Sequence, residues 1–155
     1  MYGTILWATD GSEGAAGALR EALTLASVTR GHIIAVHCDQ RLNGRAASRP
    51  KRADEVDLRT QIAHKVETLA QDGVDIELVI RRSHREAADV VAAAAAELGA
   101  DVIVCGTRGS GALAGMFLGS FTQRLLHIAP CPVIAVPERS VVSGGSRRRA
   151  TAVGA

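Results

Sequence analysis

The chain has 155 residues, a length that suits one domain, and 47% of them are hydrophobic while 22% are charged. Its formal net charge of +2 is too small to favour nucleic acid as the main partner, and no apolar run is long enough for a membrane helix. The three cysteines are odd in number and have no CxxC spacing, which argues against a disulfide framework. We therefore expect a soluble protein of the reducing cytoplasm.

Short apolar runs alternate along the chain with longer stretches in which apolar residues recur every three or four positions. The first pattern is typical of buried strands and the second of amphipathic helices. In chain order we expect a strand at Thr4–Thr9, a helix at Ser12–Thr29, a strand at His32–Cys38, a mobile loop at Asp39–Arg52, a helix at Ala53–Gln71, a strand at Val74–Arg81, a helix at Ser83–Leu98, a strand at Asp101–Gly106, a helix from about Ser120 to Ala129 and a strand at Val133–Val136. Residues 1–137 form the expected domain, and residues 138–155, which lack periodicity, form a tail that we expect to be disordered.

Local signals refine the ends of the helices. Ser12 is a plausible N-cap of the first helix, and Gly14 and Gly17 would let that helix approach the sheet or a ligand closely. Ser83 and Glu86 have the S-x-x-E spacing of a capping box, which predicts that the third helix begins there.

Strands that alternate with helices predict right-handed crossovers. The fold class that follows is α/β, with a five-stranded parallel, doubly wound sheet and helices on both faces, a Rossmann-like arrangement. Charges alternate with apolar residues in Val74–Arg81, which suggests a strand at the sheet edge. Ligands of such sheets bind beyond the carboxyl ends of the strands, where strand order reverses. We therefore expect Thr9, Asp10 and Gly106 to lie near a site.

The segment GTRGSGALAGMFLGSFTQRLL, from Gly106 to Leu126, carries the clearest chemical signal. It joins a buried strand to a helix start, where free backbone N–H groups and the helix dipole attract anions. It is neither a P-loop, because no GK[ST] follows, nor a dinucleotide fingerprint, which is expected after the first strand. From these residues alone, a phosphate loop and a simple chain-reversing turn are equally good interpretations.

The glycine spacing resembles a known motif. Gly106, two residues, Gly109, nine residues and then Gly119-Ser120 resembles the ATP-binding motif of universal stress proteins, G-x₂-G-x₉-G-[ST]. The runs ILWATDGS, VHC, DVIVCGTRG and HIAPCPVIAV also look like segments of that family, so the likeness covers roughly residues 3 to 137. The resemblance implies a fold like that of the adenine nucleotide alpha-hydrolases. It departs at Arg82-Ser83-His84, where the family often has G-x-P or G-x-A, and at Cys38, where valine is commoner.

The resemblance also implies roles for individual residues. Asp10 would accept hydrogen bonds from adenine or ribose, although an N-terminal helix cap is the other interpretation of this carboxylate. Cys38 would contact adenine through its backbone, and Arg108 would either pair with phosphate or be simply solvated. The full implied set of nucleotide-binding residues is Ala8, Thr9, Asp10, Cys38, Gly106, Arg108, Gly109, Gly119, Ser120 and Phe121.

The function implied is that of an ATP-binding stress or signalling module with little or no hydrolysis, holding ATP or another adenine nucleotide together with Mg²⁺. Two alternatives stay open: a slow ATPase or phosphotransferase that uses Ser120 or Asp10, and an interaction protein that needs no nucleotide. No catalytic or metal residues are assigned, and His37, in an apolar strand, is expected to be a hydrogen-bonded core or rim residue. The family resemblance and the exposed edge of Val133–Val136 both predict a homodimer through that strand.

Overall fold

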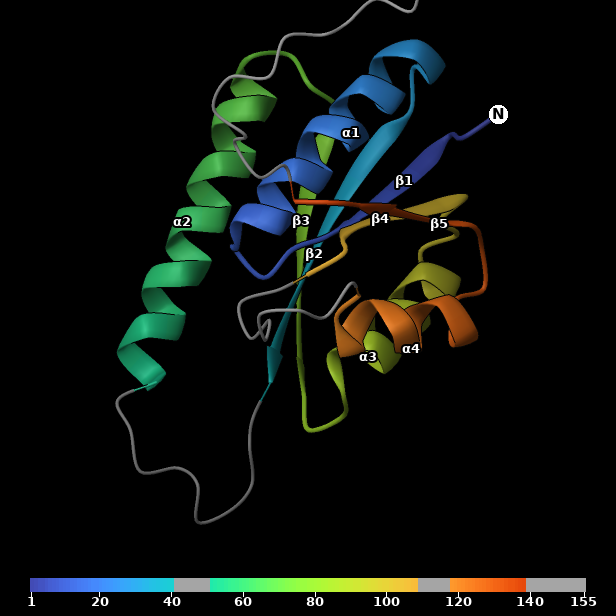
Figure 1. The fold of residues 1–155 in the computed structure, drawn as a ribbon. Coiled ribbons are helices and arrows are strands. Elements are labelled where there is room, and N and C mark those ends of the chain that lie inside the picture. Colours follow the sequence, from blue (N-terminus) through green and yellow to red (C-terminus); the bar gives the residue numbers. More distant parts are fainter. Residues whose placement is uncertain (41–50, 109–117, 139–155) are drawn as a thin grey trace, which may run out of the picture.

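A computed structural model describes residues 1–40, 51–108 and 118–138 of the chain (Figure 1). Its helices and strands follow the expected order. They are β1 (Thr4–Ala8), α1 (Glu13–Thr29), β2 (His32–Gln40), α2 (Lys51–Gln71), β3 (Ile76–Ser83), α3 (Ala87–Glu97), β4 (Val102–Gly106), α4 (Ser120–Ile128) and β5 (Val133–Val136). No helix within the described ranges combines the length and the apolar character needed to cross a bilayer.

The strands form one sheet in the order β3-β2-β1-β4-β5, and every neighbouring pair is parallel. The chain moves outward from β1 to β2 and β3, then crosses back to place β4 on the other side of β1. Strand order therefore reverses between β1 and β4, which is where a doubly wound sheet binds its ligands. The predicted parallel sheet and the edge position of β3 are confirmed.

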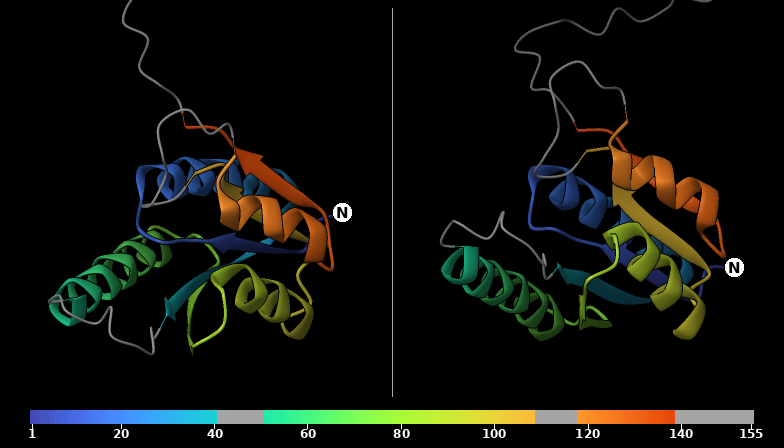
Figure 2. Two further views of the ribbon diagram at one scale, coloured as in Figure 1. Left: turned by 60° about the horizontal axis from the view of Figure 1, so that its bottom comes forward. Right: turned by 90° about the horizontal axis from the view of Figure 1, so that it is seen from below.

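Helices cover both faces of this sheet, with α1 and α2 on one side and α3 and α4 on the other (Figures 1 and 2). The two layers have separate cores because successive side chains of a strand point to opposite faces. Ile5 and Trp7 of β1 belong to the core beneath α1, whereas Leu6 and Ala8 belong to the core shared with α3. Leu125 of α4 is fully buried in this second core.

Trp7, the single tryptophan of the chain, joins β1 to the start of α1. Its side chain is 3% exposed, and its indole Nε1–H donates a hydrogen bond of 2.9 Å to the backbone oxygen of Ala15. A buried indole needs such a partner because an unpaired N–H away from water costs free energy. The bond fixes the first turns of α1 above the sheet.

The capping box predicted at Ser83 and Glu86 is wrong. Ser83 is the last residue of β3, and its side-chain oxygen accepts the N–H of Arg85 at 3.0 Å. α3 begins at Ala87, and its N-cap is Glu86, whose side chain makes no capping bond. A serine side chain can bond a backbone N–H in a turn as readily as at a helix start, and the turn is what forms here.

Three other boundaries differ from expectation. β2 continues to Gln40 and α2 already begins at Lys51, so the predicted loop at Asp39–Arg52 is shorter at both ends; its residues 41–50 lie outside the described ranges. Val74 does not start β3, because its N–H donates to the oxygen of Leu69 and still closes the end of α2. The predicted tail also lies outside the described ranges from residue 139 onward.

Candidate functional site

The carboxyl end of β1 leads directly into the start of α1. Thr9, which is 6% exposed, donates its N–H to the oxygen of Val36 at 3.0 Å and so continues the pairing with β2. Asp10 Oδ1 accepts the N–H of Ser12 at 3.0 Å, and the Ser12 hydroxyl accepts the N–H of Ala15 at 3.3 Å. Ser12 is therefore confirmed as the N-cap. Asp10 supports the same turn, so any ligand role of its carboxylate comes in addition to this one.

The backbone of Cys38 extends past the last residue of β1. Ala8 pairs with Val36, which is the last position in the β1–β2 register. Since backbone groups alternate in direction along a strand, the N–H and C=O of Cys38 point to the same side as those of Val36. They therefore face the position beyond the end of β1. The thiol lies on the α3 face, and burial raises its pKa, helped by the charges of Asp39 and Glu55.

The end of β4 lies directly under the first turn of α1. A Cβ placed on Gly106 would be 2.8 Å from both the carbonyl carbon and the oxygen of Gly14. A Cβ on Gly14 would in turn overlap the backbone oxygen of Arg108. These two glycines are needed for close contact between helix and strand, so Gly106 has a packing role that does not depend on a ligand.

α4 begins beside this strand end and is tied to it by two hydrogen bonds. The N–H of Gly119, the N-cap residue, donates to the oxygen of Thr107 at 2.7 Å. The hydroxyl of Thr122, which is 1% exposed, donates to the oxygen of Gly106 at 2.9 Å. Glycine has no side chain with which to cap the first turn, and Ser120 at the first helical position is exposed. Gly119 therefore contributes no side-chain cap, and within the described residues the first turn of α4 presents backbone N–H groups without one, a geometry that suits an anion.

The structure brings most of the predicted site residues to this one edge of the sheet. Phe121 packs its ring against the core shared with α3, which leaves only its backbone at the helix start. Arg108 is half-buried, and its carbonyl faces Gly14. Gly109 lies outside the described ranges. The residues gathered at the edge are Ala8, Thr9, Asp10, Cys38, Gly106, Arg108, Gly119, Ser120 and Phe121.

α2 adds contacts that the sequence analysis did not anticipate. His37 is 3% exposed, and its ring nitrogens lie 2.9 Å from the backbone oxygen of Thr9 and 2.7 Å from Oε1 of Glu55. This confirms His37 as a buried, hydrogen-bonded residue. Gly11 has a φ of 75°, and a Cβ on it would overlap Cδ1 of Leu58. No motif marks Glu55 or Leu58 in the sequence, because only the fold brings α2 to this edge.

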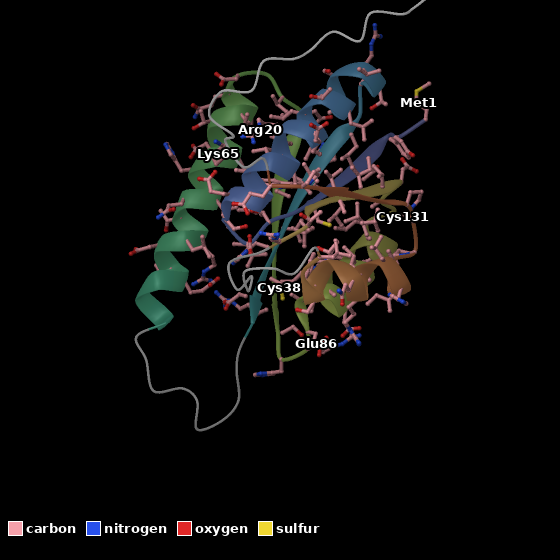
Figure 3. The ribbon with its side chains drawn as sticks, in the orientation of Figure 1. Met1, Arg20, Cys38, Lys65, Glu86 and Cys131 are labelled. Carbon is pink, nitrogen blue, oxygen red and sulfur yellow. The ribbon has the colours of Figure 1, made fainter. Side chains whose placement is uncertain are left out.

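Other surface features carry little chemistry. Two shallow hollows follow the flank of α1 and β5, with Gly17, Glu21 and Val136 among their lining residues. Within residues 1–40, 51–108 and 118–138, no group of three His, Cys, Asp or Glu side chains is placed to hold a metal ion. All three cysteines are free thiols, and Cys38 and Cys131 lie far apart (Figure 3).

The sequence matches the Universal stress protein family over residues 1–137. The chain belongs to this family. A universal stress protein from Thermus aquaticus is 36% identical to it over 138 residues, which cover 88% of this chain and 99% of that protein. The membership inferred from the glycine spacing and the strand motifs is thereby confirmed.

Solved universal stress proteins share the fold. UspA from Lactobacillus plantarum superimposes with a TM-score of 0.67 at 22% identity, covering 87% of this chain and 97% of UspA. The universal stress protein from Archaeoglobus fulgidus in complex with dAMP superimposes with a TM-score of 0.64 at 23% identity, covering 88% of this chain and 98% of that protein. A universal stress protein in complex with cAMP superimposes with a TM-score of 0.65 at 22% identity, covering 89% of this chain and 98% of that protein. These likenesses establish the shared architecture of the universal stress proteins in this chain, and the two ligands belong to those relatives.

Proposed function

We propose that the protein binds ATP, or another adenine nucleotide, at the edge formed by the carboxyl ends of β1, β2 and β4 and the start of α4. The observation that carries the proposal is the junction of β4 and α4. The N–H of Gly119 donates to the backbone oxygen of Thr107 at 2.7 Å, and the hydroxyl of Thr122 donates to the backbone oxygen of Gly106 at 2.9 Å. These bonds hold a helix start whose N-cap residue offers no side-chain cap at the point where strand order reverses, and both features favour a phosphate group.

The adenosine end would lie between β1 and β2. The N–H and C=O of Cys38 face beyond the end of β1, and together they can pair with the edge of an adenine ring, which carries a donor and an acceptor side by side. Asp10 suits ribose or adenine better than phosphate, because two negative charges repel each other. Solved universal stress proteins in complex with dAMP and with cAMP support an adenine nucleotide as the ligand class.

The phosphate end would lie against the glycine segment. Gly106, Gly109, Gly119 and Ser120, with the N–H of Phe121, would surround the phosphates, and Arg108 would add positive charge. The phosphates bring their own ligands for Mg²⁺, which in nucleotide sites keeps several waters and takes only one or two protein carboxylates. Asp10 is the carboxylate at this edge that fits such a limited role.

We assign the protein the role of a nucleotide-dependent stress or signalling module with little or no hydrolysis. In this proposal it acts in the cytoplasm, where its three free thiols stay reduced. It works as a homodimer paired through Val133–Val136, because β5 ends the sheet and, within the described residues, one row of its backbone groups has no neighbouring strand.

The test is a calorimetric titration of purified protein, stripped of bound nucleotide, with Mg-ATP, ADP, dAMP and cAMP. We expect a dissociation constant on the order of micromolar for at least one of them. Gly119→Val puts a branched side chain at the phosphate end and should abolish binding, whereas Gly3→Val, at the exposed opposite end of β1, should not. Full affinity in Gly119→Val would reject the assigned site.

Phosphate release is measured in parallel. We expect no turnover above background from the wild-type protein. Release that disappears in the Asp10→Ala, Ser120→Ala double variant would show enzymatic hydrolysis at this edge, and release that persists in it would identify a contaminant.

A further inference from the structure

We propose that His37 is a positioning residue that ties α2 to the Thr9–Asp10 peptide, so that nucleotide affinity and the docking of α2 depend on each other. The nucleotide part of this proposal rests on the function proposed above. The tie between α2 and the sheet stands on contacts that are present without any ligand.

The contacts of His37 use the whole imidazole ring. The side chain is almost fully buried, and Nδ1 lies 2.9 Å from the oxygen of Thr9 while Nε2 lies 2.7 Å from Oε1 of Glu55. A carbonyl oxygen can only accept, so Nδ1–H is the donor of the first bond. Nε2 and the carboxyl group of Glu55 share the hydrogen of the second bond. A buried ring with either nitrogen unpaired would be less stable, so both contacts hold the ring in place.

The bond to Thr9 acts on the proposed adenosine site. The oxygen of Thr9 and the N–H of Asp10 belong to one planar peptide group, so fixing the oxygen also fixes the orientation of that N–H. On its other side, Thr9 is held by its N–H bond of 3.0 Å to Val36. The backbone that leads into Asp10 is therefore fixed before and after Thr9, and His37 provides the second of these restraints.

The bond to Glu55 acts on the start of α2. Glu55 lies within the first turns of that helix, and Leu58, one turn later, fills the position that a side chain on Gly11 would occupy. The nearby arginines face a different carboxylate: Arg59 lies 3.7 Å and Arg82 lies 3.5 Å from Asp39. Glu55 is thus the carboxylate that His37 engages, and it joins the described start of α2 to the end of β1.

Two isosteric substitutions separate the two bonds. Asn places its amide nitrogen near the position of Nδ1, so His37→Asn keeps a donor for Thr9 and does not reach Glu55. Gln places its amide nitrogen near the position of Nε2, so His37→Gln reaches Glu55 and loses Thr9. Glu55→Ala removes the group on α2 that bonds Nε2, at a partly exposed position, and Glu55→Gln keeps a group there that can either donate or accept the hydrogen bond. His64→Asn and His64→Gln, at an exposed position of α2, make the same chemical changes as controls.

Two measurements are made on each full-length variant: calorimetric titration with Mg-ATP and dAMP, and hydrogen exchange of the amides in residues 55–66. We expect His37→Gln to weaken nucleotide binding by roughly tenfold, which corresponds to the loss of about one well-placed hydrogen bond. His37→Asn and Glu55→Ala should speed exchange in α2 by about tenfold and weaken binding less. Glu55→Gln should restore both properties, and the His64 variants should match the wild type.

Unchanged exchange in α2 together with unchanged affinity in His37→Asn, His37→Gln and Glu55→Ala would overturn the proposal. Glu55→Ala alone decides the matter if the buried His37 variants do not fold, because Glu55 is partly exposed. A wild-type protein that binds no adenine nucleotide would reject the proposed function instead. In that case the exchange data still decide the tie: faster exchange in Glu55→Ala supports it, and equal exchange refutes it.

Discussion

Gly14 in the first turn of α1 and Gly106 at the end of β4 meet backbone against backbone. A Cβ on Gly106 would lie 2.8 Å from the carbonyl carbon and oxygen of Gly14, a distance that real Cβ atoms do not reach. The contact brings the start of α1 onto the strand end from which the glycine segment departs. Its removal should therefore disturb stability as well as any ligand site.

Gly14→Ala should destabilise the protein by about 1–3 kcal/mol, because the new methyl group overlaps the backbone oxygen of Arg108. Gly17→Ala, the same change one turn later, meets only side-chain atoms at 3.7 and 3.9 Å and should raise stability by up to about 1 kcal/mol. Urea unfolding of both variants measures the difference. Equal changes in stability for the two variants would show that the close contact between Gly14 and Arg108 does not exclude a side chain at Gly14.

Ser120→Asp should have opposite effects on stability and on nucleotide affinity. The carboxylate would lie in the first turn of α4, where the helix dipole favours it by about 0.3–1 kcal/mol. The same charge would repel phosphate and should weaken Mg-ATP binding by roughly tenfold or more. Thermal unfolding and calorimetry measure the two effects on the same sample.

Ser120→Asn is the control for that variant, because it has the same shape without the charge. It should retain most of the affinity for Mg-ATP. If Ser120→Asp binds as well as Ser120→Asn does, the phosphates do not lie at the start of α4.

His32, at the amino end of β2, should make stability depend weakly on pH. Burial lowers its pKa, but the hydrogen bonds and charges of Asp75 and Glu77 outweigh that effect, so the net pKa is raised above its ordinary value of 6.5. The folded protein therefore holds this proton more tightly than the unfolded chain. The stabilisation is complete below pH 6.5 and is lost as the pH rises through the raised pKa. All three groups are partly or largely exposed, so the gain should stay below about 1 kcal/mol.

Urea unfolding between about pH 5.5 and about pH 8 measures this effect. His32→Gln should remove part of the fall in stability at the alkaline end, and His64→Gln should not. An identical pH profile for His32→Gln and the wild type would contradict the assignment.

Cys105 should be inert to thiol reagents in the folded protein. It is 1% exposed, and burial raises its pKa to about 11 despite a small opposing effect of the Thr122 hydroxyl. The thiolate is the reactive form, so at about pH 8 almost none is available. Alkylation followed by peptide mass spectrometry should show Cys105 labelled only after unfolding, and later than Cys38 and Cys131. Rapid native labelling would show that β4 opens far more often than its burial implies.

Ala135→Pro should dissociate the proposed homodimer and leave the subunit folded. The oxygens of Pro132 and Val136 accept the N–H groups of Ile103 and Thr107, so the intervening N–H of Ala135 points away from β4 toward the sheet edge. Proline removes that donor and is tolerated on edge strands. Ile134→Pro, by contrast, removes a bond to β4 and should lower the melting temperature.

Analytical ultracentrifugation at micromolar concentration measures the assembly. A wild-type dimer that persists in Ala135→Pro would place the interface elsewhere, and a monomeric wild type would reject the dimer. Either result leaves the nucleotide titrations to be judged separately.

Much of the fold was predictable because local patterns and tertiary packing agree. The near-continuous apolar residues of β1 and β4 correspond to strands buried on both faces, and the two strands end within one residue of expectation. The prediction of a helix start was wrong at Ser83, where the same residues can form either of two local structures. Ser83 can cap a helix or bond within a turn, and the choice depends on how far β3 stays paired with Gln40 of β2.

The site was predictable in part for a similar reason. The glycine spacing led to Gly106, Gly119 and Ser120, which the fold gathers at the reversal of strand order. The packing role of Gly106 could be recognised only from its contact with Gly14 in the structure. The sequence had suggested only that the glycines of α1 let this helix approach the sheet or a ligand closely. Glu55 could not be found, because its partner His37 lies on another element and their contact depends on the placement of α2.

The hydrogen bond between Trp7 and the first turns of α1 gives the protein an intrinsic optical reporter. The chain has one indole, so its fluorescence comes from one position, and its Nε1–H is bonded to Ala15, close to the Ser12 cap and the Asp10 turn. The emission wavelength of a buried indole changes with the polarity and bonding around it. A shift of that emission on adding a small molecule would record movement at the start of α1 directly, without a dye or a label.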